Sequence, residues 1–375
     1  MPRLLHLSDT HLGFQAYPRL TPDGLNQREI DLQEAFRRVV DDAIADPPDL
    51  VVHAGDLFDH PRPNNRAIAF ALQQMRRLSE ARIPTVLVSG NHDAPRMRET
   101  GSIFRVFDGL PHVHAVYRGE PERIVAGGVV VHAVPQAVTQ EAFQRSLRGL
   151  EPSGPGPHVL VVHGTVLGVD GLFTSEFNEY QIAQGDLRPE FAYIALGHFH
   201  NFKRVAPNAY YSGSLEYCSF NEAGQSKVVL DVEAAADGVQ VRARPVQSRP
   251  MHDLGTIEAR GLEPRALADA VAGRLQDAPA SGIVRLTVED ADRGVARLVD
   301  WDALRARRPD LTHLDLRVRT LDDSHAVDGG FELGTLSQEF EAFLARRPLP
   351  AADRERVREE ALRCLSEAGG SSHAA

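Results

Sequence analysis

The sequence predicts an α/β fold, because short β-branched runs alternate with amphipathic helical stretches over the first two thirds of the chain. With 375 residues the chain is longer than one hydrophobic core usually supports, so we expect a large domain and a smaller companion. Several predicted strands end directly in a cluster of polar residues. Open α/β sheets build their sites from loops beyond the carboxyl ends of strands, so these clusters are candidate site residues.

The predicted strands of the large domain are bounded mostly by glycine, proline or aspartate. They are Arg3–Leu7, Leu50–His53, Thr85–Ser89, Val129–Ala133, His158–His163, Tyr193–Leu196 and Ala209–Ser212. Two helices are predicted, Glu29–Ala45 with Asn26 as its candidate cap, and Asn64–Ala81. An apolar stripe on the second helix, typical of a helix that faces a core, consists of Ile68, Leu72, Met75 and Leu78.

A second unit is predicted after the proline-bearing segment Arg244–Pro250. A helical stretch at Pro264–Gln276 and strand-like runs at Ile283–Val288 and Leu314–Val318 indicate a small α+β module. Beyond Gly334 two amphipathic segments follow, and the last residues are predicted to be disordered. For an arbitrary chain, the simplest expectation is that these two segments pack back on their own domain.

The net charge of −11 argues against a nucleic-acid partner, since such proteins usually present a basic face. Lys203 and Lys227 are the only lysines among 41 basic residues, so nearly all the positive charge sits on arginine, which suits phosphate. The sequence has no run of about eighteen apolar residues, and Asp9 interrupts its start too early for a secretory signal. We therefore expect a cytoplasmic protein without membrane association, whose two cysteines are ordinary thiols.

Five short segments carry the chemistry of the chain. They are Ser8–His11, Gly55–Asp59, Gly90–Asp93, His163–Gly164 and Gly197–His200, and each lies where a predicted strand stops. The Asp-x-His and His-x-His pairs point the same way along an extended chain, so both members of a pair can reach one centre. Carboxylates, imidazoles and one amide fit a binuclear site for manganese, iron or zinc, and the absence of cysteine argues against structural zinc. Glycines beside Asp56, Asn91, His163 and His198 let the backbone approach the metals.

These segments resemble the pattern of the calcineurin-like metallophosphoesterases. Gly55–Asp59 with the prolines after it, and Tyr211–Glu216 followed by Phe220 and Glu222, are similar to the SbcD-type nucleases. The resemblance implies a β-sandwich flanked by helices, with a small α+β capping domain and a helical C-terminal tail. The implied boundaries are 1–247 for the nuclease domain, 248–330 for the capping domain and 331–375 for the partner-binding tail.

The resemblance also implies a role for each matching residue. One divalent metal ion would be held by Asp9, His11 and His200, and the other by Asn91, His163 and His198, with Asp56 bridging the two; manganese is the expected metal. His92 is similar to the family's catalytic histidine near the leaving group, and Asp59 to the acid that orients its imidazole. Two dications against the carboxylates Asp9 and Asp56 would leave a site of about +2, which answers the objection from net charge.

The remaining histidines are expected to be structural. His6 and His53 precede Asp9 and Asp56 inside predicted strands and would support the site from the core. The others are interpreted as structural or surface residues: His112, His114, His132 and His158.

The implied function is a manganese-dependent DNA exonuclease and endonuclease that acts on double-stranded ends or hairpins. The resemblance further implies a homodimer and an SbcC-like ABC-type ATPase partner that binds the tail. Two alternatives stay open: a related phosphoesterase acting on phosphoproteins or small phosphate esters, and a DNA-end scaffold with a vestigial metal site. Four arginines at the rim either meet the DNA backbone or are simply exposed: Arg62, Arg66, Arg96 and Arg98.

Overall fold

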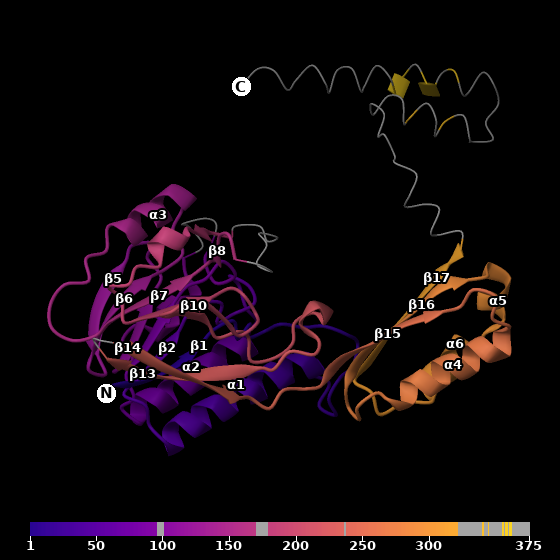
Figure 1. Cartoon of the computed structure of the whole chain (residues 1–375), viewed down its shortest axis with the longest axis horizontal. Coiled ribbons are helices and arrows are strands. Elements are labelled where there is room, and N and C mark those ends of the chain that lie inside the picture. Colours follow the sequence, from indigo (N-terminus) through magenta and orange to yellow (C-terminus); the bar gives the residue numbers. More distant parts are fainter. Residues whose placement is uncertain are drawn as a thin grey trace.

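The large domain is built from two facing β-sheets, each with helices on its outer side, and a smaller domain follows it (Figure 1). The structure is a computed structural model. It describes residues 1–95, 101–169, 179–235 and 238–321, together with scattered residues between 340 and 361.

The first sheet has six strands in the order β14-β13-β1-β2-β3-β4. Its parallel strands are β1 (Arg3–Leu7), β2 (Leu50–His53), β3 (Thr85–Val88) and β4 (Val113–Val116), and the antiparallel hairpin of β13 (Val228–Ala235) and β14 (Gly238–Pro245) extends it beside β1. The second sheet has the order β11-β12-β10-β7-β6-β5. It contains β5 (Glu122–Ala126), β6 (Val129–Val134), β7 (His158–His163), β10 (Tyr193–Gly197), β11 (Lys203–Ala206) and β12 (Ala209–Tyr211), and β8 (Thr165–Val166) pairs with β9 (Gln181–Ile182) outside both sheets.

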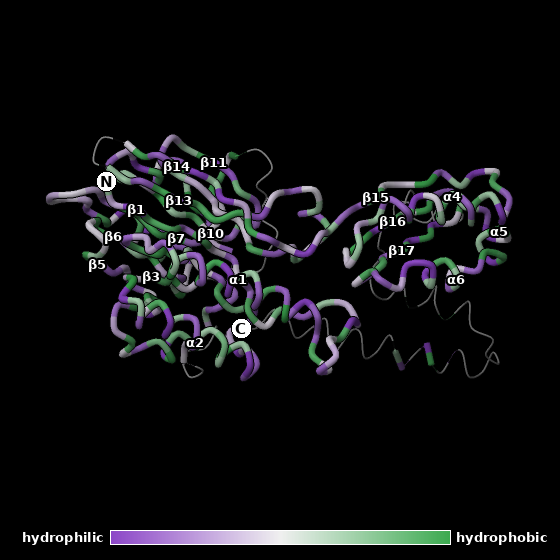
Figure 2. Tube along the Cα trace, turned by 90° about the horizontal axis from the view of Figure 1, so that it is seen from below, coloured by the Kyte–Doolittle hydropathy of each residue, from purple (hydrophilic) through white to green (hydrophobic). Residues whose placement is uncertain are grey.

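Alternate side chains of the central strands serve two different cores, because successive residues of a strand point to opposite faces. Leu4 of β1 packs between the sheets with Val159 of β7, whereas Leu5 packs outward against the helices. Helices α1 (Gln27–Ala45) and α2 (Asn65–Glu80) cover the first sheet, and α3 (Gln140–Arg148) covers the second. The hydrophobic strands at the centre of the large domain are visible in Figure 2. The predicted sandwich flanked by helices is confirmed.

The helix ends are formed by the residues that the sequence indicates. The side-chain oxygen of Asn26 accepts the backbone N–H of Arg28 at 3.0 Å, and thereby caps α1. Asn64 caps α2 in the same way. Met75 and Leu78 of the apolar stripe are buried in the core and Leu72 packs partly against it, which confirms the core interpretation for these three residues. Ile68 is half-buried outside the core cluster.

The predicted strands of the large domain all form, with ends that differ by no more than one residue. The sequence interpretation missed helix α3 and the strands β4, β5, β8, β9, β11, β13 and β14. Strand β14 lies at a sheet edge, so only alternate residues are partly covered and its apolar content is low. It continues to Pro245, which means that part of the segment interpreted as a linker belongs to the first sheet.

The smaller domain contains a parallel sheet of β15 (Met251–Glu258), β16 (Ile283–Ala291) and β17 (His313–Thr320). Its helices are α4 (Pro264–Gln276), α5 (Arg293–Leu298) and α6 (Trp301–Ala306), and α4 packs on the sheet through Leu267 and Val271. The predicted helix and the two predicted strands form; β15 was not predicted. The boundaries at residues 247 and 330 stay predictions, and the amphipathic tail falls almost wholly outside the described residues.

A buried charge network joins the two domains. Both carboxylate oxygens of Asp31, on α1, accept from the guanidinium of Arg249 at 2.6 Å, and Arg249 also donates to Thr312 of the smaller domain at 2.9 Å. Arg28 binds the same Asp31 at 2.6 Å and Glu216 at 2.8 Å. Bidentate arginine contacts restrict geometry, so this network fixes the smaller domain against α1.

We predict that Gly127→Ala lowers the free energy of unfolding by about 1–3 kcal/mol. Gly127 lies in the two-residue turn between β5 and β6 with φ of 57°, and an added Cβ would lie 2.4 Å from the carbonyl oxygen of Asp49. Chemical denaturation followed by circular dichroism measures the change. Gly273→Ala, in the interior of α4 with open space around it, is the control and should stabilise by about 0.5–1 kcal/mol. Equal stability of Gly127→Ala and the wild type would contradict the tight contact between this turn and Asp49.

Candidate metal centre

The five polar segments converge at one edge of the sandwich, where the carboxyl ends of strands from both sheets meet. Asp9, Asp56 and Asn91 follow β1, β2 and β3 of the first sheet, whereas His163 and His198 come from the ends of β7 and β10 of the second. The backbone N–H of His198 donates to Asp9 Oδ1 at 3.0 Å, which joins the two sheets directly at the site. All seven residues predicted as ligands therefore lie together.

Asp9, His11 and His200 form the first cluster of this centre. One ligand atom from each lies within 4.8 Å of the others. His11 Nε2 and His200 Nε2 are 3.0 Å apart. Ligands about 2.1 Å from one ion lie about 3 Å from each other, so this spacing fits two imidazoles that share a cation.

Asp56, His163 and His198 form the second cluster, to which Asn91 adds an amide oxygen. Asn91 Oδ1 lies 2.9 Å from His163 Nε2 and 3.2 Å from His198 Nδ1. Asp56 Oδ2 lies 3.2 Å from His163 Nε2 and 3.9 Å from His11 Nε2 of the first cluster. One carboxylate oxygen therefore faces both clusters.

Each of the four imidazoles has its second ring nitrogen beside a protein oxygen. The pairs are His163 Nδ1 with Ala54 O at 2.9 Å, His200 Nδ1 with Glu222 Oε1 at 3.1 Å, His11 Nδ1 with Asp59 Oδ1 at 3.3 Å, and His198 Nε2 with Glu179 Oε1 at 3.6 Å. For His163 and His200 the contact is a hydrogen bond, which holds the proton on the outer nitrogen and turns the lone pair of the inner nitrogen toward a metal. The contacts of His11 and His198 are longer and bring an acidic oxygen near the outer nitrogen without a hydrogen bond. The sequence interpretation gave no role to Glu179 or Glu222; Glu222 had a signal in the segment after Tyr211, and Glu179 had none.

The charge of the centre favours a cation. Asp9 and Asp56 are both about 1% exposed, and within the described part of the chain their ion pairs are with histidines alone. Burial lowers the pKa of His163, but the carboxylates of Asp56 and Asp9 and the carbonyl oxygen of Ala54 together raise it to about 9. Burial raises the pKa of Asp56, and His163 and His11 together bring it well below its usual range. The centre therefore stabilises positive charge, and its oxygen and nitrogen donors suit borderline divalent metals.

Asp93 organises the loops that carry the ligands, and its role was not predicted. Its carboxylate accepts the backbone N–H groups of Leu57 at 3.0 Å, Phe58 at 2.7 Å and Gly90 at 3.2 Å. Burial and the charge of Asp56 raise the pKa of Asp93 to about 7. The contacts tie the loop after β2 to the loop after β3, and so hold Asp56 beside Asn91.

The backbone is strained at several of the candidate ligands. The φ angles of Asp9, His11 and Asp56 are 52°, 48° and 54°, and that of His198 is 108°. Such conformations cost about 1–3 kcal/mol each for residues with a Cβ and persist where the surroundings impose them. Gly197 satisfies the expectation of close backbone approach, because a Cβ there would lie 2.0 Å from the carbonyl oxygen of Ala54. Four of the nine described non-glycine residues with positive φ therefore lie at this edge of the sandwich.

His92 lies beside His11, and the backbone of Asp59 contacts its ring. Its Nδ1 lies 2.9 Å from the backbone carbonyl oxygen of Asp59, a position for donating a hydrogen bond, whereas the Asp59 carboxylate lies 3.3 Å from His11 Nδ1 and 3.0 Å from His60 Nε2. The carbonyl of Asp59 thus contacts the ring, and one ligand atom each of His11, Asp59 and His92 lie within 4.8 Å of one another, so the orienting role of the Asp59 carboxylate stays a prediction. The ring of His92 meets the ring of His11 edge-on at 4.8 Å.

The other histidines are structural or surface residues, as predicted. His6 and His53 are buried, with Tyr193 Oη and Thr10 Oγ1 as their respective partners at 2.7 Å, and burial lowers their pKa values to about 3 and about 4. His132 and His158 contact each other at 2.9 Å, whereas His112 and His114 are exposed.

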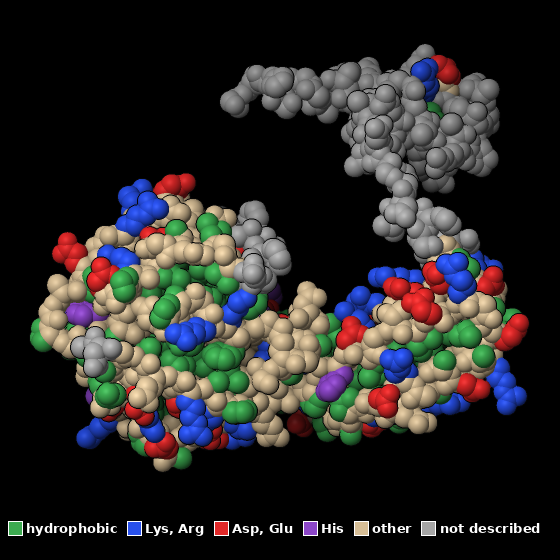
Figure 3. Space-filling view, in the orientation of Figure 1, with side chains coloured by type: hydrophobic (Ala, Val, Ile, Leu, Met, Phe, Trp, Pro, Cys, Tyr) green, Lys and Arg blue, Asp and Glu red, His purple; other side chains and the backbone are tan. Residues whose placement is uncertain are grey.

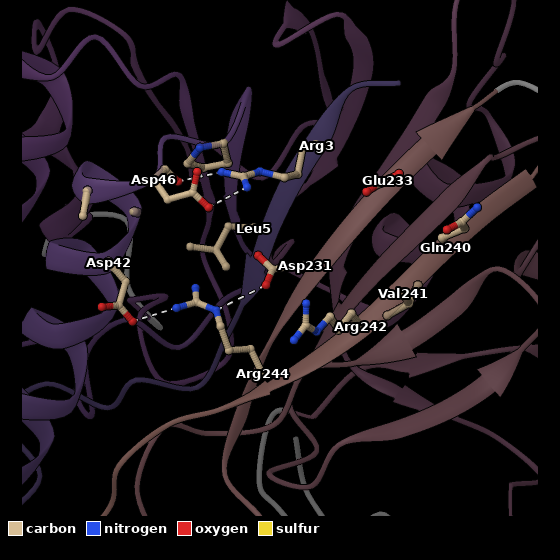
Figure 4. Close-up of a pocket in the computed structure, with 13 residues that line it drawn as sticks. Arg3, Leu5, Asp42, Asp46, Asp231, Glu233, Gln240, Val241, Arg242 and Arg244 are labelled. Carbon is tan, nitrogen blue, oxygen red and sulfur yellow. Dashed lines mark hydrogen bonds and ion pairs between the residues drawn. The ribbon is translucent and has the colours of Figure 1, made fainter.

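Arginines do not form a continuous basic face on the side of the molecule shown in Figure 3, where basic and acidic side chains are interspersed. At the predicted rim, Arg66 is 3.2 Å from the carboxylate of Glu29, while Arg96 and Arg98 lie outside the described residues. A surface pocket beside α1 lies at the opposite end of β1 from Asp9 (Figure 4). In this pocket Arg3 pairs with Asp46, and Arg244 pairs with Asp42 and Asp231. The charges of these pocket residues therefore largely compensate one another.

A search for membrane-crossing helices finds none of sufficient length and hydropathy among the described residues.

Comparison with known proteins places the fold and the site in one family. Residues 2–202 match the family model described as Calcineurin-like phosphoesterase. Over 209 residues the chain is 30% identical to the DNA double-strand break repair protein Mre11 of Saccharolobus solfataricus, covering 55% of this chain and 51% of that protein. The chain is also 32% identical over 229 residues to Mre11 of Thermoplasma acidophilum, a match that covers 58% of this chain and 57% of that protein.

A longer match is to the Mre11 protein of Aeropyrum pernix, with 31% identity over 301 residues that cover 73% of this chain and 70% of the relative. In contrast, the chain spans only about half the length of the Mre11 proteins of Saccharolobus solfataricus and Thermoplasma acidophilum. The family model covers more than half of the chain and includes every residue of the two clusters. The chain therefore belongs to the calcineurin-like phosphoesterase family.

Proposed function

We propose that this protein is a two-metal-dependent DNA nuclease that hydrolyses phosphodiester bonds during double-strand-break repair, as an SbcD-type subunit. Asp56 carries the proposal, because one of its oxygens faces both clusters of candidate ligands. The relatives named as DNA double-strand break repair proteins support DNA as the substrate.

The proposed cofactors are two divalent ions, with manganese as the first candidate. Asp9, His11 and His200 would hold one ion, Asn91, His163 and His198 the other, and Asp56 both. Bound there, the ions would supply Lewis-acid activation of a water molecule and of the phosphate. Hydrogen bonds to the outer nitrogens of His163 and His200 would turn the lone pairs of these two imidazoles toward the ions. Within the described part of the chain, the ion pairs of Asp9 and Asp56 are with histidines and not with lysine or arginine.

His92 is the proposed general acid. The carbonyl oxygen of Asp59 accepts its Nδ1–H, so the opposite nitrogen is the one that can face a substrate. A protonated imidazole can give a proton to the oxygen that leaves phosphorus, and such transfer typically contributes about 10²–10⁴ in rate. Asp59 is the proposed acid that orients this imidazole, with its carboxylate near the ring and its carbonyl oxygen accepting from Nδ1.

Several finer features belong to the same proposal. The enzyme would act as a double-strand exonuclease and as an endonuclease on single strands or hairpins, with residues 248–330 guiding the DNA. It would form a homodimer and bind an SbcC-like ABC-type ATPase through residues 331–375, in the cytoplasm. The charge network through Arg249 supports a guiding role, because it holds the smaller domain in one orientation beside the large one.

Two other functions compete with this proposal. A phosphatase of the same family would act on phosphoproteins or small phosphate esters; in such enzymes an arginine usually follows the second acid of the Gly-Asp segment, whereas His60 and Pro61 follow Asp59 here. A DNA-end scaffold would need no functional centre, and the complete donor set speaks against it. Activity on DNA separates the three.

We predict that His92→Ala lowers the rate of manganese-dependent degradation of linear duplex DNA by about 10²–10⁴. Because His92 is not among the proposed ligands, manganese binding measured by calorimetry should remain close to that of the wild type. His114→Ala removes an exposed histidine of β4 and is the matched control, with unchanged activity.

Three outcomes would contradict parts of this assignment. Equal DNA degradation by His92→Ala and the wild type would remove His92 as the acid. Rapid hydrolysis of a small phosphomonoester with no action on DNA would favour the phosphatase. Manganese binding without hydrolysis of either substrate would favour the scaffold.

We predict that a chain ending near Gly334 loses binding to the ATPase partner while it retains nuclease activity on linear DNA. The reason is that the sequence beyond this residue predicts two amphipathic helices, whose apolar faces would suit a groove on a partner. Co-purification and calorimetry with the partner measure the binding. Normal binding by the shortened chain would place the contact elsewhere.

A further inference from the structure

We propose that Glu222 is the positioning residue of His200 and that Lys227 holds Glu222 in place, so that this buried pair sets the metal affinity of the first cluster. The inference rests on the proposed function only in taking Asp9, His11 and His200 as metal ligands. It assigns a role to two residues outside the ligand set, both distant in sequence from Asp9 and His11.

Glu222 is held in one position by several donors at once. It ends the 3₁₀ turn η4 (Phe220–Glu222), and its side chain is 6% exposed. Its Oε1 accepts the backbone N–H groups of Ser219 at 3.0 Å and Cys218 at 3.2 Å, and the same oxygen lies 3.1 Å from His200 Nδ1. The turn thus delivers a fixed carboxylate oxygen to one nitrogen of His200.

Lys227 holds the other oxygen of this carboxylate. Its Nζ is ion-paired with Glu222 Oε2, and it also donates to Ser214 Oγ at 2.8 Å and to the backbone carbonyl oxygen of His200 at 3.1 Å. The three donors of the ammonium group are therefore all used, and the Lys227 side chain is only 1% exposed. Lys227 binds both Glu222 and the backbone of His200, so it fixes the distance between them.

A lysine at position 227 is unusual for this chain, whose basic residues are nearly all arginines. Only two lysines occur among 41 basic residues, and one of them is fully buried here. A compact ammonium can reach three acceptors that diverge from one point, whereas the planar guanidinium of arginine cannot. Burying both charges is costly, and removing one partner would leave the other uncompensated. The buried pair of Glu222 and Lys227 is therefore best explained by its contacts with the ring and the backbone of His200.

The contact with Glu222 decides which nitrogen of the His200 ring can bind a metal. With Nδ1–H held by Glu222, the lone pair of His200 lies on Nε2, and Nε2 faces His11 Nε2 at 3.0 Å. In the second cluster, His163 Nδ1 is held instead by the backbone carbonyl of Ala54, which no side-chain substitution removes. Changes at Glu222 should therefore weaken one metal site and leave the other intact.

The test is manganese titration of the full-length chain by calorimetry, with Glu222→Gln and Lys227→Met as variants. We expect the wild type to bind two ions, and each variant to bind one of them about 10–100-fold more weakly while the other affinity is unchanged. Glu289→Gln removes a half-exposed carboxylate that pairs with Arg319 in the smaller domain, and as the control it should change neither affinity. If Glu222→Gln does not fold, Glu222→Asp keeps the charge, shortens its reach and should weaken the same site.

A second measurement does not depend on metal. In crystals of the metal-free protein, His200 Nε2 should lie about 3.0 Å from His11 Nε2 in the wild type, and the His200 ring should be displaced from this position in Glu222→Gln. An unchanged position of the His200 ring together with two unchanged affinities would overturn the positioning role while leaving the proposed function standing. A wild type that binds no manganese would instead overturn the proposed function, and with it the effect of this pair on a metal.

Discussion

The whole arrangement depends on two carboxylates, Asp9 and Asp56, that are buried beside imidazoles without a lysine or arginine partner in the described part of the chain. Buried charge of one sign is costly unless it is compensated. The sandwich makes this concentration possible, because the parallel strands of both sheets end at the same edge and each contributes a short loop. Strained backbone at Asp9 and Asp56 and the contacts of Asp93 keep the loops there.

Much of this centre could be predicted from the sequence, because most candidate ligands lie directly after recognisable strands and some lie close to each other along the chain. Asp9 and His11, or His198 and His200, lie two residues apart directly after strands whose apolar runs are easy to recognise. Once the strands are placed side by side, their ends must meet. The glycine before Asp56 likewise indicates a close approach, and an added Cβ at Gly55 would lie 2.3 Å from His163 Nδ1.

The remainder depends on contacts between residues far apart in the chain, which no local pattern encodes. Glu222 reaches His200 and Arg249 reaches Asp31 only after the sheets and the smaller domain have packed. The contact of His92 with the backbone carbonyl of Asp59 was missed for the same reason, because it depends on the turn that Asp59 makes. Strand β14 escaped prediction because an edge strand carries few apolar residues. Charge composition was also a poor guide, because the sign of the net charge says little about the potential inside one buried site.

The most direct test of the central claim is anomalous diffraction at the manganese absorption edge from crystals of the full-length chain grown with manganese. The account predicts two peaks about 3.5–4 Å apart, one beside Asp9, His11 and His200, the other beside Asn91, His163 and His198, with an Asp56 oxygen contacting both. A single peak, or two peaks that Asp56 does not bridge, would contradict it.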